Sequence, residues 1–394
     1  MITKIKPIIK KIIYFFKLII GFQLFLFIFI FSKYKLIRFC YLRAHRIGHF
    51  VEDYYFYKQI KKKKSIDIFY LHSGGNSFLV NYVKRNSIVF PRIIVEPIYL
   101  FIILISSRFH FFRKHLAYFK YNKKSNYQHL KNKKFLKFSK IEKNLGEKYL
   151  LKINPKKKKI ACININSLEH LSIFKKQDWT RQNFRKSKIE DYEIIIKFLI
   201  KKNYLVVRTG HANKPIINNN LSKNFIDYAY TDRNDFLDIY LMSKCSLYVS
   251  NSNGLDYLAL AFNVPMFINL PLIQDFFIER DNVMYLMKQY QDIITKKNLN
   301  LEQIYSKKIL YTRDTNFFKE KKIKIIPNTK KQLLDGIKDM MEILNDVKKI
   351  KKEFQLKNDK FWNLYKKNLN TSWRKKYYLK RNIKSFYSWS NINF

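Results

Sequence analysis

The stretch from Tyr204 to Pro265 constrains the fold of this chain more than any other part. Short apolar runs, such as 204–208 and 247–249, alternate there with segments that have the apolar spacing of a helix. This alternation is typical of parallel α/β structure. Both runs lead into small polar residues and glycine. Because open parallel sheets bind ligands just beyond the carboxyl ends of their strands, the stretch predicts a site as well as a fold.

The composition fits two α/β domains and excludes a mainly disordered chain. The chain has 394 residues, 47% of them hydrophobic, which is enough for two cores. Its formal charge of +49 would suit nucleic acid or an anionic membrane. However, Lys, Ile, Asn, Phe and Tyr are all frequent, as in proteins from AT-rich genomes, so lysine is the default solvated residue. No zinc-finger spacing or single-strand-binding motif accompanies the charge, and we do not expect a nucleic-acid partner.

The three cysteines predict neither a metal site nor a disulfide framework. Cys40, Cys162 and Cys245 lie far apart, each in or beside an apolar run. Spaced in this way, they are expected to be buried thiols in a reducing compartment.

A hydrophobic block at 12–31 predicts attachment to a membrane, because about 20 apolar residues suffice to span a bilayer. Basic residues flank both sides, so the positive-inside rule gives no orientation. No small-residue cleavage site follows Phe31, which disfavours a signal peptide. A spanning helix, an in-plane anchor and a re-entrant hairpin all remain open. A second apolar run, 98–105, is too short to span and is expected to be a core helix or a secondary membrane contact.

The order of elements predicts four parts. Residues 1–37 form the membrane anchor, 38–150 a Rossmann-like domain, 151–345 a second Rossmann-like domain, and 346–394 a basic aromatic tail that packs back on the first domain. Both domains should have mostly parallel sheets. Strands are expected at 39–42, 66–71, 159–164, 204–208, 247–249 and 323–326, and helices at 50–60, 77–84, 141–151, 189–201, 281–290 and from 328 or 329 to 344.

The loop Ser250-Asn251-Ser252-Asn253-Gly254 lies between a predicted strand and a predicted helix. Such loops can offer free backbone N–H groups and the positive end of a helix dipole to an anion, typically a phosphate. Small residues let the ligand approach the backbone. An ordinary N-cap turn has the same composition, so the assignment depends on what the neighbouring strand ends carry.

A second exit loop, Arg208-Thr209-Gly210-His211, follows the strand expected beside it. Gly210 suits a tight turn, and Arg208 or His211 could reach a phosphate or a base. Arg185, near the end of the long loop 165–187, could add a cation, because a guanidinium fits two oxygens of a diphosphate at once. A solvated arginine and an exposed histidine are the plain alternatives.

A comparable loop in the first domain is Arg46-Ile47-Gly48-His49. His49 could act as a general base there, and a capped turn near a basic membrane surface is the alternative. The sequence shows no paired acidic motif for a metal-bound nucleotide, no Ser/His/Asp arrangement and no phosphate loop with lysine. We therefore expect neither a metal nor a cofactor.

Taken in order, these residues resemble a bacterial family of glycosyltransferases from surface-polysaccharide gene neighbourhoods. The matching segments include Cys162-Ile-Asn-Ile165, Asp178-Trp179, Phe184-Arg-Lys-Ser187, Val207-Arg-Thr-Gly210, Ile226-Asp-Tyr-Ala229 and Asn253-Gly-Leu255, with Arg46-Ile-Gly-His49 before them and Phe361-Trp362 after them. The resemblance covers about 43–365 and is densest in 160–270. It implies a GT-B-like enzyme, in which two Rossmann-like domains face a cleft. The nucleotide-sugar would bind mainly to the second domain and the acceptor would approach from the first, usually without a metal.

The chain departs from the family pattern at positions that carry chemistry. Asn164, Asn166 and Ser167 stand where a run of the His-x-Arg-Asp kind is expected, and Gln182 replaces another histidine. Two acid/base groups and one cation are lost, which leaves His49 and His211 as candidate bases.

Together these features predict a membrane-associated glycosyltransferase on the cytoplasmic face of the inner membrane. It would move a sugar from a nucleotide-sugar, as co-substrate, to an envelope polysaccharide or lipid-linked acceptor. The predicted donor site comprises Arg185, Arg208, Gly210, His211, Ser250, Asn251, Ser252, Asn253 and Gly254. One alternative is a non-catalytic nucleotide- or sugar-binding paralogue. Another is a basic membrane- or nucleic-acid-binding protein, whose binding to a phosphate backbone would fall steeply with salt.

Overall fold

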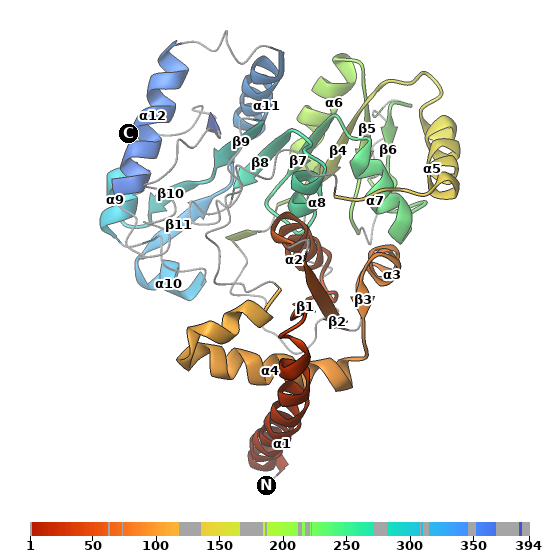
Figure 1. Cartoon of the computed structure of the whole chain (residues 1–394). Helices are drawn as coiled ribbons and strands as arrows, with labels where there is room; N and C mark the ends of the chain where they lie inside the picture. Colours follow the sequence, from red (N-terminus) through yellow and green to blue (C-terminus); the bar gives the residue numbers. More distant parts are fainter. Residues whose placement is uncertain are drawn as a thin grey trace. The chain divides into compact units, whose positions relative to one another are not determined.

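The computed structural model describes most of the chain, in two units that are treated separately: Met1–Phe135 and Leu136–Phe394 (Figure 1). Both units are α/β structures with parallel sheets. The described residues are 2–61, 64–72, 74–117, 135–165, 184–185, 187–211, 215–216, 221, 223–270, 282–307, 309, 315–345, 352–367 and 386–387.

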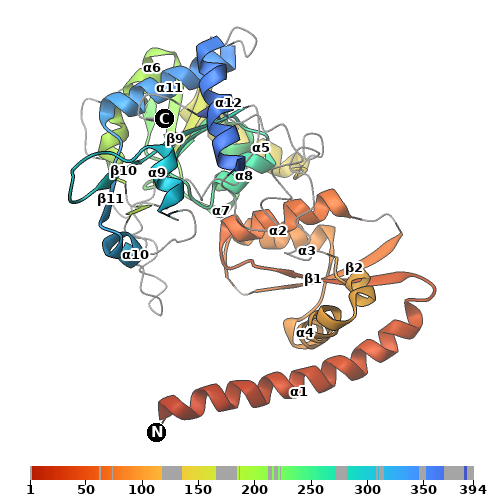
Figure 2. The same ribbon diagram turned by 90° about the vertical axis from the view of Figure 1, so that its left-hand side faces the viewer.

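The first unit is a three-stranded parallel sheet between two layers of helices (Figure 2). Its strands are β1 (Leu36–Leu42), β2 (Ser65–Leu71) and β3 (Ile88–Val89), in that order across the sheet. The helices are α1 (Ile2–Phe31), α2 (Ile47–Ile60), α3 (Ser77–Asn86), α4 (Arg92–Arg108) and the short 3-10 helix η1 (His110–His115).

Alternation along β1 separates the two faces of this sheet, since successive side chains point to opposite sides of a strand. Phe39 packs with Val95 and Ile102 of α4 in one core. Arg38 lies on the other face, where it forms a buried ion pair with Asp67 at 2.6 Å, and Asp67 also accepts from the Tyr57 hydroxyl of α2. The sequence prediction began this strand at Phe39 and so missed the part that contains the buried arginine.

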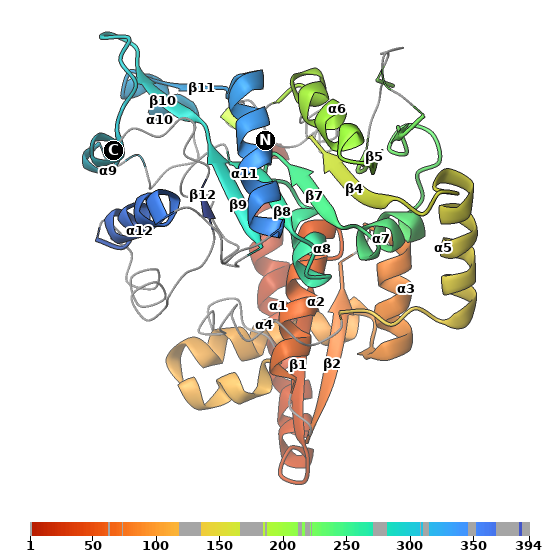
Figure 3. The same cartoon turned by 90° about the horizontal axis from the view of Figure 1, so that it is seen from above.

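The second unit is built on a seven-stranded sheet in which every strand pair is parallel (Figure 3). The order across it is β12-β9-β8-β7-β4-β5-β6. The bounds are β4 (Lys159–Asn164), β5 (Tyr204–Arg208), β6 (Phe225–Ile226), β7 (Leu247–Ser250), β8 (Met266–Leu270), β9 (Val283–Met287) and β12 (Phe386–Tyr387). Strands β7, β8 and β9 are buried along their whole length, as expected for a parallel sheet covered on both faces.

Helices pack against this sheet. Ile195 and Leu199 of α6 and Ile337 and Met340 of α11 form one core with the strands. The helices are α5 (Lys140–Ile153), the 3-10 helix η5 (Ile189–Tyr192), α6 (Glu193–Lys201), α7 (Asp235–Ser243), α8 (Asp256–Ala261), α9 (Leu301–Ser306), α10 (Thr315–Glu320), α11 (Lys330–Asn345) and α12 (Lys352–Lys367). Thr329 and Gln332 cap α11 reciprocally, at the position predicted from the sequence.

The helix predicted at 281–290 was wrong. This segment forms β9 in the main sheet and β10 (Gln289–Asp292), which pairs antiparallel with β11 (Ile323–Ile326). The residues of β9 are all apolar and fully buried between two other strands. A short continuous apolar run has no periodicity to distinguish a buried strand from a helix.

The division between the units falls at Phe135, whereas the sequence predicted it at residue 150. Helix α5 belongs to the second unit, where Glu147 accepts the Tyr240 hydroxyl of α7 at 2.7 Å. The tail was predicted to pack on the first domain. Its described parts, α12 and β12, belong to the second unit, and β12 pairs with β9 there.

Candidate functional site

In the sheet of the second unit, the order in which the chain adds strands reverses at β4. After β4 the chain adds β5 and β6 on one side, and it then returns to the other side of β4 with β7. The strand order therefore reverses between β4 and β7, and ligands of open α/β sheets bind in the crevice at such a switch point. Asn164 ends β4 and Ser250 ends β7, and the two residues are register partners across the switch.

The loop after β7 is rigidly built from its own side chains. Ser250, Asn251, Ser252 and Asn253 are all buried, while Gly254 is exposed. The Asn253 side-chain oxygen accepts from the Tyr248 hydroxyl and the Leu255 amide, at 3.1 and 3.0 Å. The loop is thus preformed, with its shape fixed before any ligand arrives.

This internal bonding corrects the prediction that the loop offers free backbone donors along its length. The Asn253 amide donates to Asp256 Oδ2 at 3.0 Å, and the Ser252 amide donates to Ser250 Oγ at 3.4 Å. The following helix, α8, has only six residues, so its dipole is small. The exposed position where a ligand could approach the backbone is Gly254.

Asn164 connects the two predicted exit loops. Its backbone oxygen accepts from Asn253 Nδ2 at 3.0 Å, and its own Nδ2 donates to Asn253 Oδ1 at 3.3 Å. On the other side, Gly210 has φ +94°, and a Cβ there would lie 2.8 Å from Asn164 Nδ2. The sequence placed the two loops on neighbouring strands, but β4 separates β5 from β7, and Asn164 fills the space between the loops.

Arg185 lies on the loop at the switch point, where the sequence predicted a supplementary cation. Its Nη2 donates to the Ser252 carbonyl at 2.7 Å, and its own carbonyl accepts from Asn251 Nδ2 at 3.3 Å. A second cation adjoins it, because buried Lys288 donates to the Phe184 carbonyl at 3.0 Å. Burial, and then the charge of Arg185, lower the pKa of Lys288 to about 8.

Asp256 is a buried carboxyl group beneath the same loop. Its side chain is fully buried, and among the described residues its Oδ1 has no hydrogen-bond partner. Burial raises its pKa to about 7, against the hydrogen bonds from Ser250, Asn253 and Tyr248 and the charge of Arg185, which lower it. Burial therefore favours the protonated form of this carboxyl group. Sequence reasoning missed both Asp256 and Lys288, because nothing in their sequence neighbourhood signals burial.

The remaining predicted donor residues have other surroundings. Arg208 is held in an ion pair with Asp227, whose Oδ2 lies 3.1 Å from Nη1 and also accepts the Ile216 amide. His211 is exposed in the loop that follows. Arg208 therefore fastens the end of β5 to the segment after β6.

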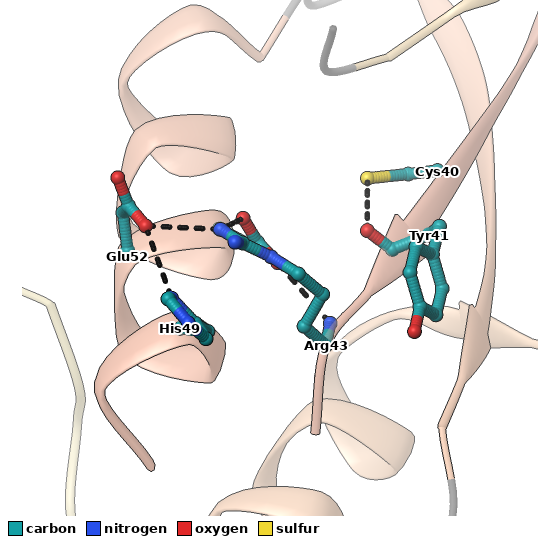
Figure 4. Close-up of polar contacts among 6 residues, drawn as sticks. Cys40, Tyr41, Arg43, His49 and Glu52 are labelled. Atoms are coloured by element: carbon teal, nitrogen blue, oxygen red, sulfur yellow. Dashed lines mark hydrogen bonds and ion pairs between the residues drawn. The ribbon is translucent and has the colours of Figure 1, made fainter. Parts of the chain in front are cut away.

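At the carboxyl edge of the first unit, charged side chains gather after β1 (Figure 4). Arg43 bonds to Asp53 through two nitrogens, at 2.6 and 2.8 Å, and to Glu52 at 2.9 Å. His49, in the first turn of α2, points to the same Glu52 carboxylate, with 3.6 Å between Nδ1 and Oε2. Glu52 is thus an acidic neighbour of His49, while His49 Nδ1 has no hydrogen-bond partner among the described residues.

Two further histidines complete this edge. The rings of His45 and His72 lie 4.6 Å apart, and burial, followed by the neighbouring basic groups, lowers the pKa of His45. Gly75, with φ +94°, lies so close to the Ala44 carbonyl that any Cβ would collide with it. The exits of β1 and β2 are thus packed together. His72 directly follows the strand predicted at 66–71, but only the register of β1 and β2 shows that it meets His45.

Among the residues that the structure describes, no group of three or more His, Cys, Asp or Glu side chains could hold a metal ion. Asn166, Ser167 and Gln182, where the chain departs from the family pattern, lie outside the described residues.

No family model and no curated protein sequence matches the chain. Two similar solved structures are glycosyltransferases. ADP-heptose LPS heptosyltransferase II of E. coli aligns with 13% identity and a TM-score of 0.42, over 63% of this chain and 90% of its own. The glycosyl transferase family 9 protein of Veillonella parvula aligns with 10% identity and a TM-score of 0.47, over 79% of this chain and 98% of its own. Both belong to the class that the sequence motifs resemble. At TM-scores below 0.5, neither similarity assigns an activity to this chain.

Proposed function

We propose that the chain is a GT-B-type glycosyltransferase that moves a sugar from a nucleotide-sugar to an envelope polysaccharide or lipid-linked acceptor. The observation that carries this proposal is the switch point of the second unit. There, the preformed loop after β7 and the guanidinium of Arg185 meet beyond the carboxyl ends of parallel strands. Small, neutral, hydrogen-bonding residues beside a fixed cation suit a nucleotide diphosphate.

In the proposed donor complex, the diphosphate lies beyond Asn164 and approaches the backbone at Gly254. The bond from Arg185 to the Ser252 carbonyl fixes the direction of the guanidinium, so little ordering is required when the ligand binds. A guanidinium has five N–H donors in a rigid fork, which matches two phosphate oxygens. Lys288 adds positive charge at the segment that carries Arg185.

The proposed reaction is attack of an acceptor hydroxyl on the anomeric carbon of the donor sugar. The bond between that carbon and the diphosphate oxygen breaks, and the negative charge that develops on the diphosphate is stabilised by Arg185 and Lys288. His49 accepts the hydroxyl proton as general base, and the charge of Glu52, 3.6 Å from Nδ1, stabilises the imidazolium. His211 is the other candidate base.

The resemblance to GT-B enzymes supports an arrangement in which the two units face a cleft, with the acceptor on the first unit and the donor on the second. One helix of the described residues, at Ile8–Phe31, is long and apolar enough to cross a membrane, with a mean hydropathy of 2.3. It supports the proposal that the enzyme is attached to the inner membrane. Because nucleotide-sugars are made in the cytoplasm, we place the cleft on the cytoplasmic face.

A second candidate is a paralogue that binds a nucleotide-sugar but transfers nothing. The side chain of Asn164 favours it, because this amide occupies a position where the family resemblance implies an acid/base group, and it is bonded to Asn253. Both candidates bind a nucleotide-sugar, but only the enzyme transfers its sugar.

The proposal is tested with the full chain in detergent, by following its thermal midpoint in the presence of UDP, GDP, ADP, CDP and dTDP. A ligand that binds only the native state raises the midpoint, and at 100 times its Kd it adds about 2.7 kcal/mol. We expect one diphosphate to act at micromolar concentration and to keep its effect in 0.5 M salt. No shift with any of them, or shifts that vanish with salt, would exclude a nucleotide pocket. Release of the diphosphate from the matching nucleotide-sugar then separates the enzyme from the binding paralogue.

A further inference from the structure

Helix α1 is a built-in part of the first unit over its second half. It runs alongside α4 (Figure 2), and Gly21 lies so close to the Pro97 carbonyl that there is no room for a Cβ. Phe25 is 3% exposed and packs against Phe101 and against His115 of η1, with ring centroids 5.7 and 5.2 Å apart. The helix is therefore not a tether that leaves the folded unit.

From Ile8 onward, most of its remaining surface is apolar and exposed. Only 11% of the apolar window in Ile8–Phe31 is buried, far less than in the core helix of a soluble protein. The exposed large apolar side chains are Ile8, Ile9, Ile12, Ile13, Phe15, Phe16, Ile19, Ile20, Phe22, Leu24, Leu26, Phe27, Ile30 and Phe31. A continuous patch of this kind marks an interaction surface.

The helix and loop that α1 packs against expose apolar side chains as well. Ile93 on α4 is 82% exposed, and Ile94 and Leu104 on the same helix are also exposed. Phe109 and Phe111 are exposed next to η1, and the Lys114 amine lies 3.6 Å from the centre of the Phe111 ring. An aromatic ring beside a lysine is typical of the boundary between acyl chains and head groups.

An ion pair limits how α1 can meet a bilayer. Lys17, in the middle of the helix, pairs with Glu96 of α4, which also binds Arg92. The apolar stretch after Lys17, 18–31, has a length of roughly 21 Å at 1.5 Å per residue, short of the ~30 Å hydrocarbon core. A spanning helix would have to draw the lysine and its carboxylate partner into the hydrocarbon, which is costly.

We propose that α1 lies in the plane of the membrane, within one leaflet, and that the exposed apolar residues of α4 and η1 form a second contact with the same leaflet. Its partner is a lipid bilayer with anionic head groups. Exposed basic residues lie near both ends of the apolar helix, at Lys10, Lys11, Lys33 and Lys35, and beside the second contact, at Arg108 and Lys114. A second copy of the chain fits less well, because a two-fold contact through this surface would bring the same lysines together.

This inference uses only residues of the first unit and does not depend on the transferase activity. It selects one of the three arrangements that the hydrophobic block left open. It also requires the N-terminus and both units to lie on the same side of the membrane.

The first test determines the side of the N-terminus. The full chain, with an epitope tag before Met1, is added to preformed vesicles of 70% phosphatidylcholine and 30% phosphatidylglycerol, and also examined in inverted inner-membrane vesicles. In both preparations, protease added outside the vesicles should remove the tag whenever it also cleaves the two units. A tag that stays protected while the units are digested would show a spanning helix and overturn the proposal.

The second test measures partitioning onto the same vesicles by flotation. Phe16→Glu together with Phe27→Glu should lower the partition coefficient at least tenfold, and Ile93→Glu together with Phe111→Glu should lower it severalfold. Leu356→Glu is the matched control, since Leu356 is a 60% exposed apolar residue on α12 of the second unit, and it should leave binding unchanged. Leaving out phosphatidylglycerol should also weaken binding. Unchanged partitioning of the Phe16/Phe27 variant, or lipid-free dimers that these substitutions dissociate, would overturn the proposal.

Discussion

The two parallel sheets carry different chemistry at the same edge. In the first unit, the strand exits present charged groups, namely Arg43 with its two carboxylates and three histidines. In the second unit they present buried amides and hydroxyls, with the cations Arg185 and Lys288 beside them and the carboxyl group of Asp256 beneath the loop. A histidine beside carboxylates suits proton transfer, whereas a preformed loop of neutral side chains next to two cations suits binding of an anion. This contrast supports the proposal that the acceptor binds to the first unit and the donor to the second.

The way each edge holds its buried carboxyl groups shows the same contrast. Asp53 accepts hydrogen bonds from two nitrogens of Arg43, which lower its pKa against the larger, raising effect of burial. Asp256 receives only uncharged donors and the more distant charge of Arg185, so its pKa is raised to about 7. An anion bound near Asp256 would favour its protonated form.

The largest expected effect concerns the first edge. His49→Ala should lower the rate of sugar transfer by about 10²- to 10⁴-fold, the usual contribution of a general base, with little change in nucleotide binding. The rate is measured as diphosphate release from the matching nucleotide-sugar in the presence of acceptor. His211→Ala, in the exposed loop of the second unit, is the comparison variant. If both variants lose the same fraction of the rate, or if His49→Ala loses none, the general base does not lie in the first unit.

Substituting a glycine should destabilise the protein more at the first edge than at the second. At Gly75 a Cβ meets the backbone of Ala44, whereas at Gly210 it meets the side-chain amide of Asn164, which can shift. Gly75→Ala should therefore cost about 3 kcal/mol or more, and Gly210→Ala about 1–2 kcal/mol. Thermal midpoints give both values.

Gly74→Ala is the matched control for this measurement. Its φ of +88° is as strained as that of Gly75, but nothing lies within 4 Å of an added Cβ. If Gly74→Ala and Gly75→Ala destabilise the protein equally, backbone strain alone accounts for the loss, and the two exit loops are not packed as described.

A pH-dependent effect is expected from the buried carboxyl group of the second edge. The folded-state pKa of Asp256, about 7, lies above its ordinary value of 3.8, so the folded protein holds a proton that the unfolded chain has lost. Its contribution to stability is complete below pH 4 and is lost as the pH rises through 7. Asp256→Asn removes this dependence. Between pH 5 and pH 8 the variant should gain a few kcal/mol relative to the unmodified protein, measured from thermal midpoints at each pH. Parallel pH profiles for the two proteins would show that Asp256 is ionised throughout.

Much of the fold follows from sequence patterns, and the exceptions have physical causes. Strands β4, β5 and β7 were predicted because each is a short apolar run between turn residues. The start of β1 was missed, since Arg38 looks exposed until Asp67 on the neighbouring strand pairs with it. Strand β9 has no alternation to reveal it, because both of its faces are buried.

The candidate site was predictable in part. Small polar residues between a strand and a helix identified the loop after β7. Arg185 contacts this loop, through a hydrogen bond to the Ser252 carbonyl. The position of Asn164 between the two loops depends on strand order, which no local pattern contains. The pairing of Arg208 with Asp227 and the burial of Lys288 likewise arise from contacts between distant segments.

The central claim, a nucleotide diphosphate held at the switch point of the second unit, is tested most directly by calorimetry on Arg185→Ala. The titrant is the diphosphate that gives the largest thermal shift. Lys201→Ala is the charge-matched control, since Lys201 is exposed at the end of α6, just before β5 begins and thus at the opposite edge of the sheet. We predict that Arg185→Ala raises the Kd by about 10- to 100-fold, the range for losing hydrogen bonds to a charged group, and that Lys201→Ala leaves it unchanged. Equal Kd values for Arg185→Ala and the unmodified protein would contradict the claim.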